Sequence, residues 1–84
     1  MRILVVEDDS LLAQGLTRIL SRAGHAVDQA ETGLEADKAL RTTPYELVVL
    51  DIGLPDIDGF EVLRRLRRRH AVTNVLVLTA RDAV

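Results

Sequence analysis

Acidic side chains stand directly behind two short apolar runs of the sequence. Glu7 and Asp8 follow the run Ile3–Val6, and Asp51 follows the run Leu47–Leu50. Apolar runs of this length are typical of strands that are covered on both faces of a sheet. If such strands are parallel and adjacent, their carboxyl ends meet at one edge, where open α/β sheets bind ligands. The sequence therefore predicts that these three carboxylates lie close together.

This predicted cluster has the donor chemistry of a metal site. Three carboxylates that lie close together repel one another unless a cation neutralises them, and oxygen ligands favour a hard divalent ion such as Mg²⁺. Asp51 could then act as a nucleophile. The hydroxyl of Thr79, which follows the apolar run Val75–Leu78, could donate to an incoming oxyanion. A carboxylate nucleophile, a metal and a hydroxyl donor together favour phosphoryl transfer.

Acidic residues near strand ends also have ordinary structural roles, since many of them cap helices or stay solvated. For Asp9 and Asp58, each of which precedes a predicted helix, we favour one of these structural roles. For Glu7, Asp8 and Asp51 we favour a functional site, because all three converge on one edge of the predicted sheet.

The periodicity of apolar residues predicts the elements that position this cluster. Strands and helices alternate along the chain, and capping-box patterns at Thr32 and Glu35 and at Asp58 and Glu61 mark two helix starts. The predicted strands are Ile3–Val6, Ala26–Ala30, Leu47–Leu50 and Val75–Leu78; the predicted helices are Ser10–Ala23, Gly33–Thr42 and a third from Asp58 to about Arg69. Single helices between strands imply a parallel α/β sheet with right-handed crossovers.

Length and composition restrict the classes of protein that fit. The 84 residues allow one small domain, and 48% hydrophobic residues are normal for a globular chain. There is no cysteine, which excludes disulfides and fits a reducing compartment. The formal net charge of −2 gives no reason to expect direct binding to nucleic acid or to an anionic membrane. We expect a single soluble, cytoplasmic domain over residues 1–84.

Three motifs then carry a family resemblance. They are VVEDD at Val5–Asp9, VVLDIGLPDIDG at Val48–Gly59 and VLTA at Val77–Ala80. In this order and spacing they resemble the receiver domain of two-component response regulators, and especially the OmpR/PhoB-type transcription factors. The resemblance implies a flavodoxin-like (CheY-like) three-layer α/β fold. The family's sheet order is 2-1-3-4-5, which for this chain becomes 2-1-3-4.

The resemblance also assigns roles at the acidic edge. It implies that Asp51 is the phosphoacceptor, which takes a phosphoryl group from a phosphohistidine on a sensor histidine kinase. Asp8, Asp51 and the main-chain carbonyl of Gly53 would bind Mg²⁺, and Glu7 would act through water.

Further roles fall on the second half of the chain. Thr79 would be the switch hydroxyl, while Gly53 and Arg81 would occupy the two positions that tune the lifetime of the phosphate. The family implies a signalling domain and not an enzyme beyond self-phosphorylation and self-dephosphorylation. The parent protein would be a DNA-binding transcriptional regulator.

The sequence departs from the family pattern at its end. Receivers have a fifth strand with a lysine that pairs with the phosphoryl group, followed by a last helix, whereas this chain ends at Val84 and its one lysine, Lys38, lies in the second predicted helix. We therefore expect a receiver without the usual fifth strand and last two helices. Its apolar fourth strand, Val75–Leu78, would form a bare sheet edge, and self-association through that edge is expected.

Two other functions compete with a receiver. One is an inactive structural or interaction fragment, which the missing lysine favours. The other is a fragment of an aspartate-nucleophile phosphatase of the haloacid-dehalogenase type. That family has a second aspartate two residues after the nucleophile, where this chain has Gly53.

Overall fold

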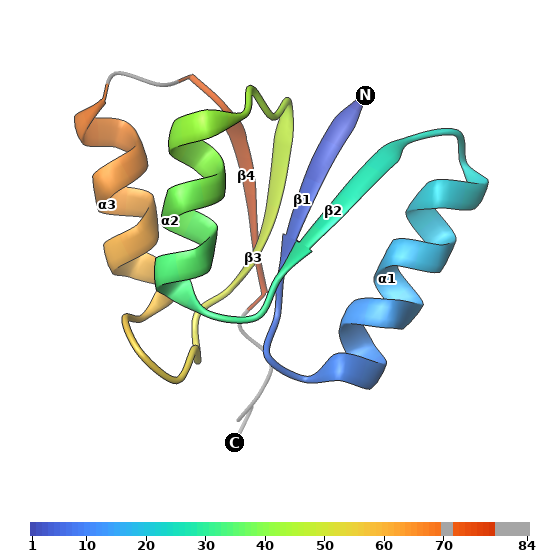
Figure 1. The fold of residues 1–84 in the computed structure, drawn as a ribbon, viewed down its shortest axis with the longest axis horizontal. Helices are drawn as coiled ribbons and strands as arrows, with labels where there is room; N and C mark the ends of the chain where they lie inside the picture. The colour runs from blue at the N-terminus through green and yellow to red at the C-terminus, as the bar shows by residue number, and fades with distance from the viewer. Residues whose placement is uncertain (70–71, 79–84) are drawn as a thin grey trace.

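Strands and helices alternate in the computed structural model, which describes residues 1–69 and 72–78 (Figure 1). The strands are β1 (Arg2–Val6), β2 (Ala26–Ala30), β3 (Leu47–Asp51) and β4 (Asn74–Leu78), and the helices are α1 (Ser10–Arg22), α2 (Gly33–Thr42) and α3 (Gly59–Arg68). The predicted order of elements is confirmed. No boundary differs from the predicted one by more than one residue: β1 and β4 start one residue earlier and β3 extends to include Asp51, while the caps Ala23, Asp58 and Arg69 lie outside their helices.

The strands form one parallel sheet in the order β2-β1-β3-β4, as predicted. The central strands β1 and β3 are neighbours, and Val6 lies opposite Leu50 at the end of their ladder. These two strands are almost fully buried. Because both of their faces are covered, their sequences are unbroken apolar runs. The edge strands β2 and β4 are more exposed, and Leu76 of β4 is 56% exposed.

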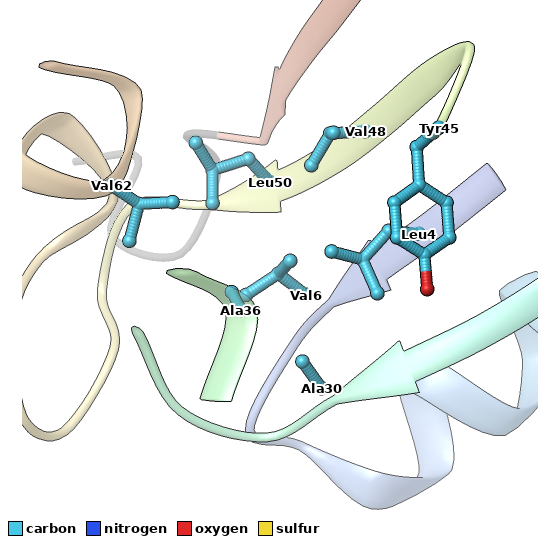
Figure 2. Packing of buried hydrophobic residues seen from close by; sticks show 8 residues of the cluster. All are labelled: Leu4, Val6, Ala30, Ala36, Tyr45, Val48, Leu50 and Val62. Carbon is cyan, nitrogen blue, oxygen red and sulfur yellow. The ribbon is translucent and has the colours of Figure 1, made fainter. Parts of the chain in front are cut away.

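The sheet is covered by α1 on one face and by α2 and α3 on the other (Figure 1). Alternate residues of β1 serve the two layers: Leu4 and Val6 belong to the core under α2 and α3, and Ile3 and Val5 to the core under α1. The larger core is built from the eight residues labelled in Figure 2: Leu4, Val6, Ala30, Ala36, Tyr45, Val48, Leu50 and Val62. This arrangement is the three-layer fold that the sequence predicted.

Polar side chains fix the start of each helix. Asp9 Oδ1 accepts the amides of Leu11 and Leu12 at 3.0 and 3.2 Å, and Asp58 Oδ1 accepts the amide of Glu61 at 2.9 Å. Capping of this kind stabilises a helix by about 1 kcal/mol. The structural roles predicted for Asp9 and Asp58 are thus confirmed.

The apolar stripe of α1 is only partly covered by the described residues. Leu16 and Leu20 pack on the sheet, but Leu12 is 46% exposed and Ile19 is 67% exposed. In the described part of the chain, no helix is both long enough and apolar enough to cross a membrane.

A polar cluster ties the amino-terminal part of the sheet together. The Tyr45 hydroxyl donates to Asp28 Oδ2 at 2.6 Å, and Arg2 Nη2 donates to the same oxygen at 3.0 Å. The Arg2 guanidinium also lies 5.7 Å from the centre of the Tyr45 ring. The hydrogen bonds from Tyr45 and Arg2 hold the pKa of Asp28 below its ordinary value.

Tyr45→Phe is expected to lower the free energy of unfolding by about 1 kcal/mol at neutral pH, because it removes one hydrogen bond to a carboxylate. The pKa of Asp28 is lowered by folding, so this contribution is present above the unfolded pKa of about 3.9 and is lost as the pH falls through the folded pKa. Urea unfolding at pH 7 and at pH 3 measures both effects. Asp28→Asn, which cannot titrate, should remove the acid-sensitive part, and an equal Tyr45→Phe effect at both pH values would contradict this prediction.

Candidate functional site

Three carboxylates converge where β1 and β3 end. One ligand oxygen from each of Glu7, Asp8 and Asp51 lies within 4.8 Å of the others. The register explains the convergence: Val6 and Leu50 are paired, so the residues that follow them leave the sheet side by side. The meeting of these side chains, predicted from the sequence, is confirmed.

The cluster is unevenly buried, which bears on its chemistry. Glu7 is 2% exposed and Asp51 is 3% exposed, whereas Asp8 is open to solvent. Placing two carboxylates out of water beside a third is costly unless positive charge or hydrogen bonds compensate. An ion could approach from the side of Asp8, where the cluster is open.

Glu7 is held by the chain on both sides of it. Its amide donates to the Ala30 carbonyl at 3.0 Å, which continues the contact between β1 and β2 past the last paired residues. Its Oε2 accepts the amide of Asp9 at 3.0 Å. Glu7 is therefore fixed in place next to the two aspartates.

Asp51 is the last residue of β3, and the loop after it folds back on its backbone. Its Oδ1 accepts the amide of Gly53 at 3.1 Å. The Ile52 carbonyl accepts the amides of Leu54 and Gly59, both at 3.0 Å. This contact brings the first turn of α3 against the end of β3, so that the loop of residues 52–58 starts and closes beside Asp51.

The first residue of α3 has to be glycine for this close approach. A Cβ on Gly59 would lie 2.7 Å from the Asp51 carbonyl oxygen and 2.8 Å from the Ile52 Cα. Both are backbone atoms, which cannot rotate away. Gly59 thus permits the first turn of α3 to lie against the end of β3, next to Asp51.

The donor set suits a hard divalent cation. All three side chains offer carboxylate oxygens, which are the ligands that Mg²⁺ prefers. Gly53 lies in the adjoining loop with its amide bonded to Asp51. Thr79 and Arg81 lie outside the described residues, so their predicted roles stay predictions.

Two contacts of this region were not predicted from the sequence. Asp56 in the loop accepts the amides of Gly33 and Leu34 at the start of α2. Burial raises the pKa of Asp56, but hydrogen bonds from backbone amides, above all those of Leu34 and Gly33, together outweigh it and leave the pKa below its ordinary value. The sequence shows an acidic residue at position 56, but it does not show that the loop carrying this residue lies against the start of α2.

The second contact is an ion-pair cluster between α2 and α3. Asp37 is 7% exposed and is bonded by Arg69 at 2.9 Å, with Arg65 at 3.5 Å and Arg41 at 3.6 Å. It holds the two helices of one layer together. Local sequence spacing does not indicate the pairs with Arg65 and Arg69, because these arginines come from α3 and its cap whereas Asp37 lies on α2.

A family model matches this chain over nearly its whole length. The match is to the response regulator receiver domain and covers residues 3–84.

Curated relatives match over the whole chain. The transcriptional regulatory protein PmrA of Pectobacterium parmentieri is 50% identical over 84 residues, which is 100% of this chain and 38% of that protein. BasR of Escherichia coli K12 is 48% identical over the same shares. TcrA of Mycobacterium tuberculosis H37Rv is 51% identical and is covered to 33%. The chain thus spans about two fifths of these relatives or less.

Solved structures agree in fold. The receiver domain of the Francisella response regulator 1452 superposes with a TM-score of 0.91 at 32% identity, covering 96% of this chain and 67% of that one. The Thermotoga maritima response regulator TrrA, solved in complex with Mg²⁺ and BeF, gives 0.90 at 38% identity and covers 98% of this chain and 71% of that one. With the acidic edge and the sheet order in place, this chain belongs to the family of response regulator receiver domains.

Proposed function

We propose that this chain accepts a phosphoryl group on Asp51 in a Mg²⁺-dependent reaction. The observation that carries the proposal is the convergence of Glu7, Asp8 and Asp51, with Asp51 buried at the end of β3. The likeness to TrrA, which was solved in complex with Mg²⁺ and BeF, supports the same use of the site.

In this proposal the residues at the acidic edge have separate roles in metal binding and in phosphoryl transfer. Asp8, Asp51 and the Gly53 carbonyl hold Mg²⁺, and Glu7 acts through water. When bound, Mg²⁺ neutralises the charge that builds up during phosphoryl transfer. An oxygen of Asp51 bonds to phosphorus as the phosphorus–nitrogen bond of a phosphohistidine breaks. The electron pair of that bond stays on the imidazole nitrogen, and the product is an aspartyl phosphate.

The partners follow from the family. Receiver domains take their phosphate from sensor histidine kinases, and the relatives are transcriptional regulatory proteins. We propose the same donor for this chain, a cytoplasmic location, and action on DNA only through parts of the protein beyond these residues. Thr79 as the switch hydroxyl, and Gly53 and Arg81 as rate-tuning positions, belong to the same proposal. Self-association through β4 stays a prediction from the sequence.

Metal removal tests the proposal. Incubation with acetyl phosphate and Mg²⁺ is expected to give an acid-stable, hydroxylamine-labile adduct. Excess EDTA should prevent it, because no divalent cation is then left to neutralise the charge that builds up during phosphoryl transfer. Intact-mass spectrometry measures the adduct. The control variant is Asp58→Asn, which changes an aspartate that caps α3. In the presence of Mg²⁺ this variant should give the same yield of adduct as the wild type.

Other outcomes would point to the competing functions. No adduct at any Mg²⁺ concentration would support an inactive fragment. Rapid catalytic hydrolysis of a phosphate ester would support a phosphatase, although Gly53 stands where that family has its second aspartate.

A further inference from the structure

The loop of residues 52–58 carries the metal-binding carbonyl proposed for Gly53, and its ends are fixed. At its start the Ile52 amide donates to the Leu78 carbonyl at 3.4 Å, and at its close the Gly59 amide donates to the Ile52 carbonyl at 3.0 Å. Between these points the loop extends away from the sheet toward the start of α2 (Figure 1). Near Asp51, the Gly53 amide is bonded to the Asp51 carboxylate, and the middle of the loop makes a separate contact with α2.

Asp56 supplies that contact. Its Oδ1 accepts the Gly33 amide at 2.7 Å, and its Oδ2 accepts the Leu34 amide at 2.8 Å. These are the first two amides of α2, and the third, from Glu35, donates to Thr32 Oγ1 at 3.1 Å. Asp56 thus satisfies amide groups that a helix start would otherwise leave open. Both bonds are charge-assisted and lie at the positive end of the helix dipole, which makes them strong for a surface contact.

Gly33 shows that the loop and the helix are fitted closely. A Cβ on Gly33 would lie 2.4 Å from Ile57 Cγ1 and 2.6 Å from the Ile57 carbonyl oxygen. The loop therefore contacts α2 through both its backbone and the carboxylate of Asp56. The two partners are 23 residues apart in sequence, so this contact fixes tertiary structure and is not a local cap.

We propose that Asp56 is a positioning residue for the acidic site: by bonding the first amides of α2 it holds the loop, and with it Gly53, next to Asp51. This inference rests on the proposed function, because it assumes that Glu7, Asp8 and Asp51 bind a divalent cation. Residues that orient a metal ligand without binding the metal themselves matter for affinity, and their loss lowers metal affinity about 10- to 100-fold.

The same coupling must act in reverse. If the contact with α2 favours cation binding, cation binding favours the contact by the same factor. Mg²⁺ is therefore expected to slow hydrogen exchange at the amides of Gly33 and Leu34. Asp51→Asn, which weakens the cation site, should reduce this effect.

The experiment compares Asp56→Ala with Thr32→Ala. Both remove hydrogen bonds to the start of α2, but only Asp56 reaches it from the loop. Mn²⁺ is the probe, and its Kd is measured by water proton relaxation at a temperature where urea titration shows each variant folded. We expect a Kd about tenfold weaker for Asp56→Ala and an unchanged Kd for Thr32→Ala. Asp56→Asn, which keeps one acceptor oxygen, should fall between.

The other possible results separate failure of the positioning role from failure of the proposed function. Equal Kd values for the wild type and Asp56→Ala would overturn the positioning role while leaving the proposed function intact. A wild type that binds no Mn²⁺ would overturn the proposed function itself. If Asp56→Ala does not fold, the Asp56→Asn Kd and the wild-type exchange rates at Gly33 and Leu34 decide, and rates that Mg²⁺ leaves unchanged would overturn the inference.

Discussion

Asp51→Asn is expected to abolish the phosphoryl adduct and, without Mg²⁺, to raise the free energy of unfolding by about 1 kcal/mol. An amide is not a nucleophile toward phosphorus, so the reaction stops. The same exchange removes the carboxylate charge of the buried Asp51 from a group of three acidic side chains whose ligand oxygens lie within 4.8 Å of one another. Repulsion within this group therefore falls. The asparagine oxygen can still accept the Gly53 amide, so the fold keeps its local hydrogen bond.

Magnesium should reverse the order of stability. It binds the folded wild type and so stabilises it by mass action, but it should stabilise Asp51→Asn much less. Urea unfolding with and without Mg²⁺ measures both differences. An adduct that persists in Asp51→Asn would contradict the assignment of the phosphoacceptor. A less stable Asp51→Asn chain in EDTA would contradict the electrostatic reasoning.

Gly59→Ala is expected to have the second-largest effect. The added Cβ would meet the Asp51 carbonyl oxygen at 2.7 Å and the Ile52 Cα at 2.8 Å, and neither backbone atom can move without shifting the end of β3. We expect a loss of about 2 kcal/mol in the free energy of unfolding. We also expect adduct formation to slow by roughly tenfold or more, since small displacements of a reacting group are costly.

Gly15→Ala is the matched control for this exchange. Gly15 lies within α1, and a Cβ there would meet nothing within 4 Å. The exchange should raise stability by up to about 1 kcal/mol, because alanine favours a helix more than glycine does. Urea unfolding and the acetyl phosphate reaction compare the two variants. Equal adduct rates in Gly59→Ala and the wild type would show that the close approach at Asp51 does not set its position.

The fold was predictable because local patterns and the sheet agree. Two central strands are buried on both faces and therefore appear as unbroken apolar runs, and Thr32 and Asp58 mark helix starts through their own side chains. The meeting of Glu7 with Asp51 followed from parallel topology alone, since residues after paired strand ends lie side by side.

Other features depend on contacts between distant segments and could not be predicted. The bonds from Asp56 to α2 need the loop and the helix to be placed first, and nothing in the spacing of residues indicates them. The burial of Asp37 likewise depends on how α2 meets α3. The helical spacing of Leu12 and Ile19 predicts an apolar stripe on α1 but does not say how much of it the sheet covers.

The most direct test of Asp51 as the phosphoacceptor is to locate the adduct. After reaction with acetyl phosphate and Mg²⁺, borohydride reduces an aspartyl phosphate to homoserine, and peptide mass spectrometry identifies the changed position. Homoserine at position 51 alone is the predicted result, because Asp51 is the buried carboxylate at the end of β3 within the acidic cluster. Homoserine at Asp8, Asp56 or Asp58 with Asp51 unchanged would contradict the assignment.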